Sequence, residues 1–316
     1  MNIHVQSRDD PGVPGPDAVA GQLGVDRAEI VRCETLSERH GHRIWRIHLR
    51  DTAYVLKWFP DPESALTEVA GYQLLQELGV PTLAVHGMDS QAILMEDLAS
   101  SERWRLATEE DVWSRDTGRA LGSWYQRLHC NGSRFLSNAQ QRPTFLTRES
   151  DCLNPTTVLN LGDLLGLGDR PVWRLAAENI DLLRSAEAAM DLTLNYNDFH
   201  WTNLALSSTS DDQREAIVFD YHLLGVGTRY SDCRNVVGSL TGGAIEAFEA
   251  AYGDTDFREA VIDKPLSVLH SLVTATRRTK FPKWAVPSRD RAVSGGFERD
   301  LRDAIDLATA LCREKR

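Results

Sequence analysis

The sequence predicts an α+β protein in which a small part built on an antiparallel sheet precedes a larger, mainly helical part. Short runs rich in β-branched and aromatic residues gather in residues 30–98, whereas apolar residues at helical spacing dominate from residue 111 onward. The 316 residues, 42% of them hydrophobic, suffice to bury one large core or two medium ones.

The composition argues against several kinds of partner. The formal net charge of -11 disfavours general affinity for nucleic acid or anionic membranes and suits a cationic ligand. No apolar stretch approaches the length of a membrane span, and the first residues do not resemble a signal peptide. The five cysteines are scattered, as is usual in a reducing compartment. We expect a cytoplasmic protein, and the sequence does not indicate its oligomeric state.

The chain begins with a segment that is too rich in proline and glycine for a helix. Residues 1–16 are therefore expected to form a loose lead-in, after which Asp17 caps a short helix. Two strands follow within residues 30–49. The polar turn between them contains Gly41.

The next strand and helix each carry one charged residue of interest. Residues 54–59 form a β-rich run around Lys57, and a lysine inside an apolar strand is costly unless it finds a partner. The following helix, at residues 64–78, carries Glu68 in its first two turns. Taken alone, each of these charges is most simply a solvated one.

Two further strands complete the N-terminal part. We expect them at residues 80–85 and 92–98, and the second contains Met95, Glu96 and Leu98 where it runs into a polar loop.

The rest of the chain is predicted to be helices joined by loops. Residues 131–142 are polar, and we expect His129, at the end of the preceding helix, to be structural. Apolar residues at helical spacing predict helices at residues 111–130, 155–165, 172–190, 235–252, 266–272 and 301–312.

One stretch carries a pattern of oxygen-bearing side chains. An apolar run leads to Asp198, Asn203 follows five residues later, and a second strand-like run ends in Asp220. Phosphoryl transfer requires a group that orients the attacking hydroxyl and hard oxygen ligands that hold magnesium against the phosphates. These three residues supply groups of those types in that order.

The spacing Asp198-x-x-x-x-Asn203 with the later Asp220 resembles the core of the aminoglycoside phosphotransferase family, a group of protein-kinase-like small-molecule kinases. The resemblance implies a two-lobed protein-kinase-like fold. Residues 1–98 would form the nucleotide-binding lobe, and residues 99–316 the catalytic and substrate-binding lobe.

The sequence departs from the family at one place in this motif. The family usually has His-Gly-Asp, whereas Tyr196, Asn197 and Asp198 stand here. Because the acid is retained, we expect that another contact braces the loop and that the enzyme is active.

The resemblance implies a role for each member of the motif. Asp198 orients the acceptor hydroxyl and removes its proton, and Asn203 and Asp220 hold Mg²⁺. Lys57, positioned by Glu68, neutralises charge on the phosphates of ATP or GTP.

The nucleotide site implied by the resemblance includes two backbone segments. Glu96 and Leu98 offer backbone groups to adenine, and Met95 packs near the ring. The turn that contains Gly41 lies over the phosphates. An ordinary polar hairpin turn explains Gly41 equally well, since glycine is common in turns.

Two further residues belong to the implied site. Asp232 stands where the family has a second aspartate that supports the catalytic loop from behind. His200, inside the loop, contacts substrate or phosphate or is an ordinary loop residue. Acidic residues in the preceding stretch are candidates to meet a cationic acceptor, although each is individually most simply a solvated charge: Glu149, Asp151, Asp163, Asp169 and Glu178.

These expectations converge on a kinase that transfers the γ-phosphoryl group of ATP or GTP to a hydroxyl of a small acceptor. A cationic antibiotic, such as an aminoglycoside or a basic peptide, matches the family and the acidic balance and implies a role in antibiotic resistance. A metabolic acceptor of the choline, homoserine or sugar type is the alternative. A catalytically inactive nucleotide-binding pseudokinase is also possible because of Tyr196, although the intact acids argue against it.

Overall fold

The structure is a computed structural model that describes residues 14–39, 41–139, 142–208 and 214–314. The chain forms two compact units: Met1–Asp111 with Trp201–Leu223, and Val112–His200 with Leu224–Arg316. The predicted division after residue 98 stays a prediction. In the structure, residues 99–111 and 201–223 pack with the first unit. In the described residues, no helix has the length and apolar character that a membrane crossing requires.

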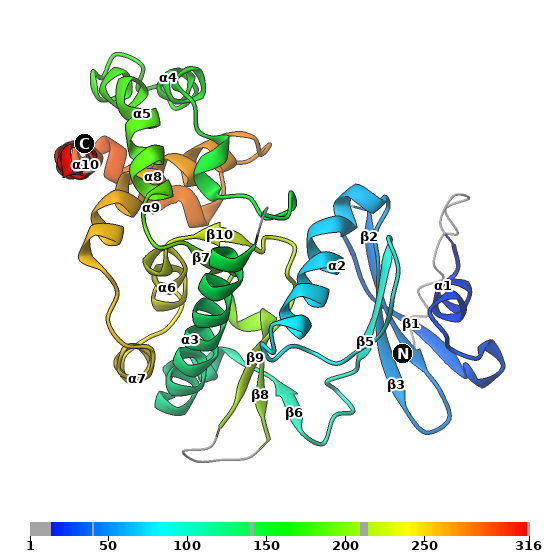
Figure 1. Ribbon diagram of the computed structural model, residues 1–316. Helices are drawn as coiled ribbons and strands as arrows, with labels where there is room; N and C mark the ends of the chain where they lie inside the picture. Colours follow the sequence, from blue (N-terminus) through cyan, green and yellow to red (C-terminus); the bar gives the residue numbers. More distant parts are fainter. Residues whose placement is uncertain (1–13, 40, 140–141, 209–213, 315–316) are drawn as a thin grey trace. The chain divides into compact units, whose positions relative to one another are not determined.

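The first unit is built on a five-stranded antiparallel sheet with the strand order β1-β2-β3-β5-β4 (Figure 1). The sheet confirms the expected antiparallel architecture of the N-terminal part. Its elements are α1 (Pro16–Gln22), η1 (Arg27–Glu29), β1 (Arg32–Arg39), β2 (His42–His48), β3 (Ala53–Trp58), α2 (Pro62–Glu77), β4 (Val85–Met88) and β5 (Ala92–Glu96).

Local signals explain the position of α2. The side chain of Asp61 accepts a hydrogen bond from the N–H of Ser64, and Pro62 occupies the first helical position, where its missing N–H costs nothing. The helix ends just before Gly79, whose φ of 66° is the left-handed conformation that commonly follows a helix. Glu68 lies on the buried face of this helix, beside Tyr72.

A second, three-stranded sheet in the first unit has the order β6-β8-β9. Its elements are β6 (Trp104–Leu106), η4 (Trp201–Asn203), β8 (Leu204–Ser207) and β9 (Ala216–Val218). Residues of β8 and β9 are buried on both faces, so this ribbon is a fixed platform for the residues at its ends.

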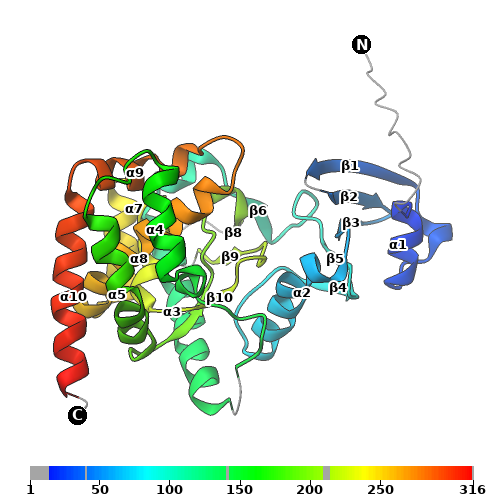
Figure 2. The same ribbon diagram turned by 90° about the horizontal axis from the view of Figure 1, so that it is seen from above.

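The second unit is mainly helical and contains one short antiparallel ribbon, β7 with β10. Helices α5, α8 and α10 lie side by side and share a core that includes Leu183, Leu269 and Leu301 (Figure 2). The short helix η2 (Glu109–Trp113) spans the division between the two units. The other elements are α3 (Arg115–Asn138), η3 (Glu149–Cys152), α4 (Pro155–Leu164), α5 (Val172–Ala188), β7 (Thr193–Asn195), β10 (Gly225–Gly227), α6 (Arg229–Val237), α7 (Gly243–Tyr252), α8 (Phe257–Thr276), η5 (Lys283–Ala285), α9 (Val286–Val293) and α10 (Gly296–Glu314).

Helices α3 and α7 touch backbone to backbone. A Cβ atom on Gly118 would lie 2.1 Å from the carbonyl oxygen of Ala244, and one on Gly122 would lie 2.7 Å from that of Phe248. Only glycine permits an approach this close. The contact fixes α3, which also carries His129.

Several predicted boundaries were wrong. Gly15 rather than Asp17 precedes α1, and Asp17 lies in its first turn, where it pairs with Arg27. No strand forms at residues 80–84, because Pro81 has no N–H for a sheet partner, and β4 begins only at Val85.

The helix predicted to end at residue 130 continues to residue 138, the last residue of α3. Gly132 explains the extension, because a Cβ there would lie 2.6 Å from the backbone nitrogen of Leu194 in β7. The ribbon therefore packs on this part of the helix and stabilises it. The helix predicted at residues 235–252 is interrupted after Val237, where Gly238 and then Gly242 lie between α6 and α7.

Candidate active site

A buried lysine lies between two carboxylates in the first unit. Lys57 Nζ, on β3, donates to Glu68 Oε2 on α2 at 2.6 Å and to Asp220 Oδ1 at 2.8 Å. Glu68 is 1% exposed and Lys57 8% exposed. Neither residue is a solvated surface charge.

The pKa values in this cluster follow from burial and from the mutual charges. Burial raises the pKa of Glu68 to about 7, against the charge of Lys57. Burial alone would lower the pKa of Lys57, but the negative charges of Glu68 and Asp220 outweigh it and raise that pKa. Burial would also raise the pKa of Asp220, yet a hydrogen bond from His222 and the Lys57 charge hold it below its usual value. Lys57 and Asp220 are therefore both ionised.

Asp220 has an unusual backbone. Its φ of 69° lies in the left-handed region, which aspartate tolerates better than most residues, and such conformations cluster at functional sites. Its N–H makes a long hydrogen bond of 3.5 Å to the hydroxyl of Tyr72, whose ring meets that of Tyr221 edge to face at 4.7 Å. Helix α2 thus helps to hold the backbone that presents this carboxylate.

Asn203 lies at the same end of the β8–β9 ribbon as Asp220. The two strands pair Leu204 with Val218, and the N–H of Phe219 donates to the carbonyl of Asn203 at 3.1 Å. The carboxamide and the carboxylate are oxygen donors of the kind that Mg²⁺ prefers. Their chemistry and their placement in one unit fit the predicted magnesium site.

The backbone before Asp198 is held by Asp232, on α6 of the second unit. Asp232 is fully buried, and its carboxylate accepts the N–H of Tyr196 at 2.7 Å and the N–H of Asn197 at 3.0 Å. His129 Nε2 lies 3.1 Å from the same carboxylate. Asn197 has a φ of 64°, so this contact holds a strained turn directly before Asp198.

His129 connects several parts of this brace, which sequence reasoning did not foresee. Its Nδ1 lies 2.7 Å from the hydroxyl of Tyr252, and its carbonyl accepts a hydrogen bond from the hydroxyl of Thr193 at 2.7 Å. The only signal in the sequence was a histidine at a helix end. Tyr196, which replaces the usual histidine of the family, is instead buried, with its ring edge to face with Trp124 at 6.2 Å.

The other predicted residues are placed as follows. Asp198 is half-buried. His200 is exposed and is the last residue of the segment Val112–His200 of the second unit. Met95 is buried in β5, and Leu98 is buried just after it. Gly41 has a φ of 82° in the turn between β1 and β2, which explains the glycine there without any ligand.

Glu96, at the end of β5, already uses one of its backbone groups. Its N–H donates to the carbonyl of Ala84 at 2.9 Å, and its carboxylate accepts the N–H of Ala84 at 3.0 Å. The N–H of Glu96 is therefore not free to donate a hydrogen bond to adenine.

The structure thus brings together Lys57, Glu68 and Asp220 in the first unit and sets Asn203 at the same end of a ribbon. Asp198 and its brace belong to the second unit. This combination of fold and side chains defines a protein-kinase-like small-molecule kinase.

The chain belongs to the phosphotransferase enzyme family, whose sequence profile matches residues 32–261. The predicted membership of the aminoglycoside phosphotransferase family and the α+β kinase-like fold are confirmed. The protein is a phosphotransferase with an alcohol group as acceptor. A search of curated proteins found no significant match.

Solved structures of kinases with different acceptors are similar to this chain. Choline kinase LicA from Streptococcus pneumoniae is 15% identical, with a TM-score of 0.58 over 88% of this chain and 96% of that one. Macrolide 2'-phosphotransferase MphH from Brachybacterium faecium is 17% identical, with a TM-score of 0.51 over 87% and 95%. ADP-bound aminoglycoside phosphotransferase APH(2'')-Ib is 14% identical, with a TM-score of 0.50 over 92% and 97%. At these identities the similarity shows the fold.

Proposed function

We propose that the protein transfers the γ-phosphoryl group of ATP or GTP to a hydroxyl of a small, cationic acceptor in the cytoplasm. The observation that carries this proposal is the buried Lys57, bonded to both Glu68 and Asp220. Phosphoryl transfer depends on fixed positive charge where negative charge spreads over the phosphate oxygens. A lysine held in place by two carboxylates supplies such a charge.

Asn203 and Asp220 would hold the magnesium ion. Asp220 is suited to this role because the surrounding charges keep it ionised. When bound, the ion neutralises charge on the phosphates. Glu68 is the second partner of Lys57 and would keep it in place if Asp220 coordinated the ion.

Asp198 accepts the proton of the acceptor hydroxyl. The O–H bond of the acceptor breaks, a bond forms between its oxygen and the γ-phosphorus, and the nucleoside diphosphate leaves with the electrons of the broken P–O bond. The two backbone hydrogen bonds to Asp232 hold the chain directly before this acid. The loop is therefore braced without the usual histidine.

A cationic acceptor fits the net charge of -11. The similar structures include a choline kinase and an aminoglycoside phosphotransferase, both named for such acceptors. An antibiotic acceptor would make the protein a resistance enzyme, and a metabolic amino alcohol would make it a housekeeping one.

A screen of acceptors tests the proposal. Purified protein, Mg²⁺ and either ATP or GTP are incubated with amino sugars, basic peptide antibiotics and small amino alcohols, and the acceptor mass is measured. We expect one class to gain the mass of a phosphoryl group in a reaction that requires Mg²⁺. Nucleotide binding without phosphorylation of any acceptor would instead support the inactive pseudokinase.

A further inference from the structure

The segment that joins α8 to α9, orange in Figure 2, carries a concentration of positive charge. Residues 277–291 contain six arginines and lysines and one acid, Asp290, which gives a formal charge of +5. Since the whole chain has a formal charge of -11, the other residues together carry -16. Two of the five lysines of the chain, Lys280 and Lys283, lie here within four residues. The charge of this segment is therefore opposite to that of the rest of the molecule.

Most of these cations have no carboxylate partner. Arg291 is bound to Asp300, and Arg289 Nε lies 3.9 Å from a carboxylate oxygen of Asp290. Within residues 14–39, 41–139, 142–208 and 214–314, no carboxylate lies within ion-pair distance of the other four, which are all exposed: Arg277, Arg278, Lys280 and Lys283.

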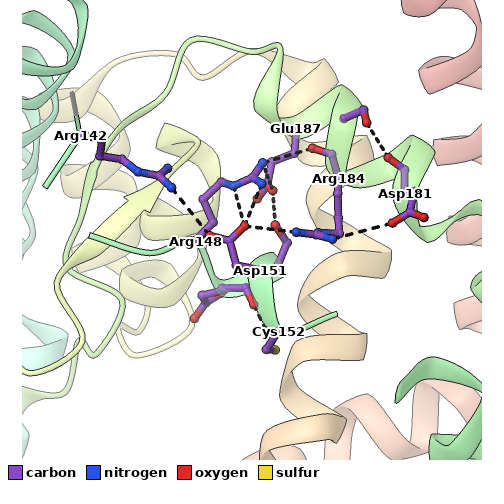
Figure 3. A network of polar contacts seen from close by, with 10 residues as sticks. Arg142, Arg148, Asp151, Cys152, Asp181, Arg184 and Glu187 are labelled. Atoms are coloured by element: carbon purple, nitrogen blue, oxygen red, sulfur yellow. Dashed lines mark hydrogen bonds and ion pairs between the residues drawn. The ribbon is translucent and has the colours of Figure 1, made fainter. Parts of the chain in front are cut away.

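Other arginines of the same unit are used to hold elements together. In the network that joins η3 to α5, Arg148 contacts Asp151 at 2.8 Å, and Arg184 contacts the same carboxylate at 3.4 Å (Figure 3). Arg234 donates to Asp263 at 2.7 Å. The four exposed cations of the segment, in contrast, keep their charge available to a partner outside the chain.

An exposed tryptophan lies among these cations. Trp284 is 50% exposed, and the guanidinium of Arg278 lies over its ring, 6.0 Å from the centroid. Arg289 lies in the same way over the ring of Phe281, at 5.3 Å. A tryptophan combines a large apolar ring with one N–H donor and is suited to the boundary between water and lipid headgroups. The segment therefore offers an anionic partner both charge and an amphipathic ring.

The segment is anchored to the helical unit, so these side chains are held in one place. Ala285 and Ala292 are buried, and Phe281 packs against the core that α5, α8 and α10 share. The stretch from Arg278 to Trp284 has seven residues, which span at most about 25 Å even when fully extended. Its three cations and its tryptophan therefore act on one small area of a partner.

We propose that residues 277–291 form a docking surface for a membrane that contains anionic phospholipids. Lysines and arginines near such a membrane are attracted to the negative headgroups, and the tryptophan ring enters the interface. The acids elsewhere on the chain do not prevent this, because salt screens charges over about 8 Å under physiological conditions. The net charge disfavours general affinity for anionic membranes, but it is compatible with binding through this one surface.

A nucleic acid is also anionic, but it fits the segment less well. Single-stranded nucleic acid binds aromatic side chains by stacking its bases on the ring faces. One face of Trp284 and one face of Phe281 are already covered by guanidinium groups, and Phe281 is half-buried. A lipid interface has no such requirement, because the ring can enter it edge first.

Vesicle sedimentation tests the docking surface independently of kinase activity. The full-length protein is mixed with vesicles of phosphatidylcholine alone or of phosphatidylcholine with phosphatidylserine, and the bound fraction is measured. We expect binding to the anionic vesicles to be about tenfold stronger or more at physiological salt, and to weaken at high salt as the charges are screened.

The matched variants are Lys280→Gln/Lys283→Gln and Arg127→Gln/Lys264→Gln, each of which removes two exposed positive charges. Arg127 on α3 and Lys264 on α8 lie outside the segment, so their variant should bind anionic vesicles like the wild type. Loss of Lys280 and Lys283 should weaken this binding about tenfold or more. Trp284→Gln should weaken it about fivefold or more, because less apolar surface enters the interface. Thermal unfolding checks that all three variants are folded.

Three results would overturn the inference. They are the absence of vesicle binding by the wild type, equal binding to the two kinds of vesicle, and an equal loss of binding in the two double variants. Fluorescence anisotropy with labelled oligo-dT and labelled polyglutamate examines other polyanions at equal charge concentration. Tighter binding of either one, lost in Lys280→Gln/Lys283→Gln, would assign the surface to a nucleic acid or an acidic polypeptide and contradict the membrane proposal.

Discussion

Lys57 lies in an apolar strand, where a charge is tolerated only with partners. Two carboxylates supply them, and the pair with Glu68 is the more buried of the two. Removing one partner of a buried ion pair generally costs about 3–5 kcal/mol, because the remaining charge is left uncompensated. Asp220 is about one third exposed, so its loss should cost less stability than the loss of Glu68.

We expect Asp220→Ala to abolish the effect of Mg²⁺ on nucleotide binding. The variant removes the ionised carboxylate that we assign to the metal but leaves Lys57 paired with Glu68. Calorimetric titration of ATP with Mg²⁺ and with a chelator measures this effect. Glu77→Ala, at an exposed position of α2, is the control and should keep the wild-type difference. An unchanged Mg²⁺ effect in Asp220→Ala would rule out its assignment as a metal ligand.

Glu149→Gln should change stability in a way that depends on pH. The pKa of this acid is about 7 in the folded protein, against an ordinary value of 4.5. Between these values the folded state binds more protons than the unfolded state, so wild-type stability falls as pH rises from about 4.5 to about 7. Because glutamine does not ionise, the Glu149→Gln variant does not lose stability in this way over the same pH range.

Denaturant unfolding at several pH values measures the difference between wild type and Glu149→Gln. The variant should match the wild type near pH 4.5 and be more stable at pH 8, by a few kcal/mol at most. His270, Arg234, Asp263, Asp232 and Glu187 act on the same carboxyl group. A stability difference that does not change with pH would contradict the raised pKa of the half-buried Glu149.

Sequence reasoning succeeded for residues whose partners are implied by the order of elements. A lysine in a strand followed by a glutamate early in the next helix led to Lys57 and Glu68, which the structure joins at 2.6 Å. The same reasoning took Glu149 most simply as a solvated charge, whereas its side chain is only partly exposed and lies 3.4 Å from His270 on α8, a contact between distant segments. The place of His129 beside Asp232, 103 residues further along, is hidden in the sequence for the same reason.

At the scale of elements, the spacing of apolar residues and the turn residues predicted those helices and strands whose own sequence carries such signals. Helices α4 and α5 and strands β1, β2 and β3 lie where they were expected. Errors arose where tertiary packing decides the outcome. Polar residues 131–138 are helical because a glycine lets them pack on β7, and residues 80–84 are not a strand because Pro81 removes a sheet donor.

The contact between α3 and α7 predicts a strong effect of a small substitution. In Gly118→Ala the new Cβ would lie 2.1 Å from the carbonyl oxygen of Ala244, so the helices must move apart. Overpacking of this kind costs about 1–3 kcal/mol. We expect thermal unfolding several degrees below that of the wild type. Ser123→Ala, at an exposed site on the same helix, should be neutral or slightly stabilising, and equal melting of the two variants would contradict the close packing.

For the whole molecule, the fold identifies a class of chemistry but not an acceptor. The similar structures include kinases named for choline, macrolides and aminoglycosides at 14–17% identity. The same scaffold thus carries different acceptor sites, because acceptor contacts come from side chains that the fold does not specify.

We propose that Asp198 takes the proton of the acceptor hydroxyl. The most direct test is the steady-state rate of acceptor phosphorylation by Asp198→Asn, with nucleotide affinity measured on the same sample. Because asparagine keeps the shape but cannot accept the proton, we predict a fall in kcat of about 10²–10⁴-fold with unchanged nucleotide affinity. Asp191→Asn, an exposed acid before β7, should behave like the wild type. Wild-type turnover by Asp198→Asn would contradict the account.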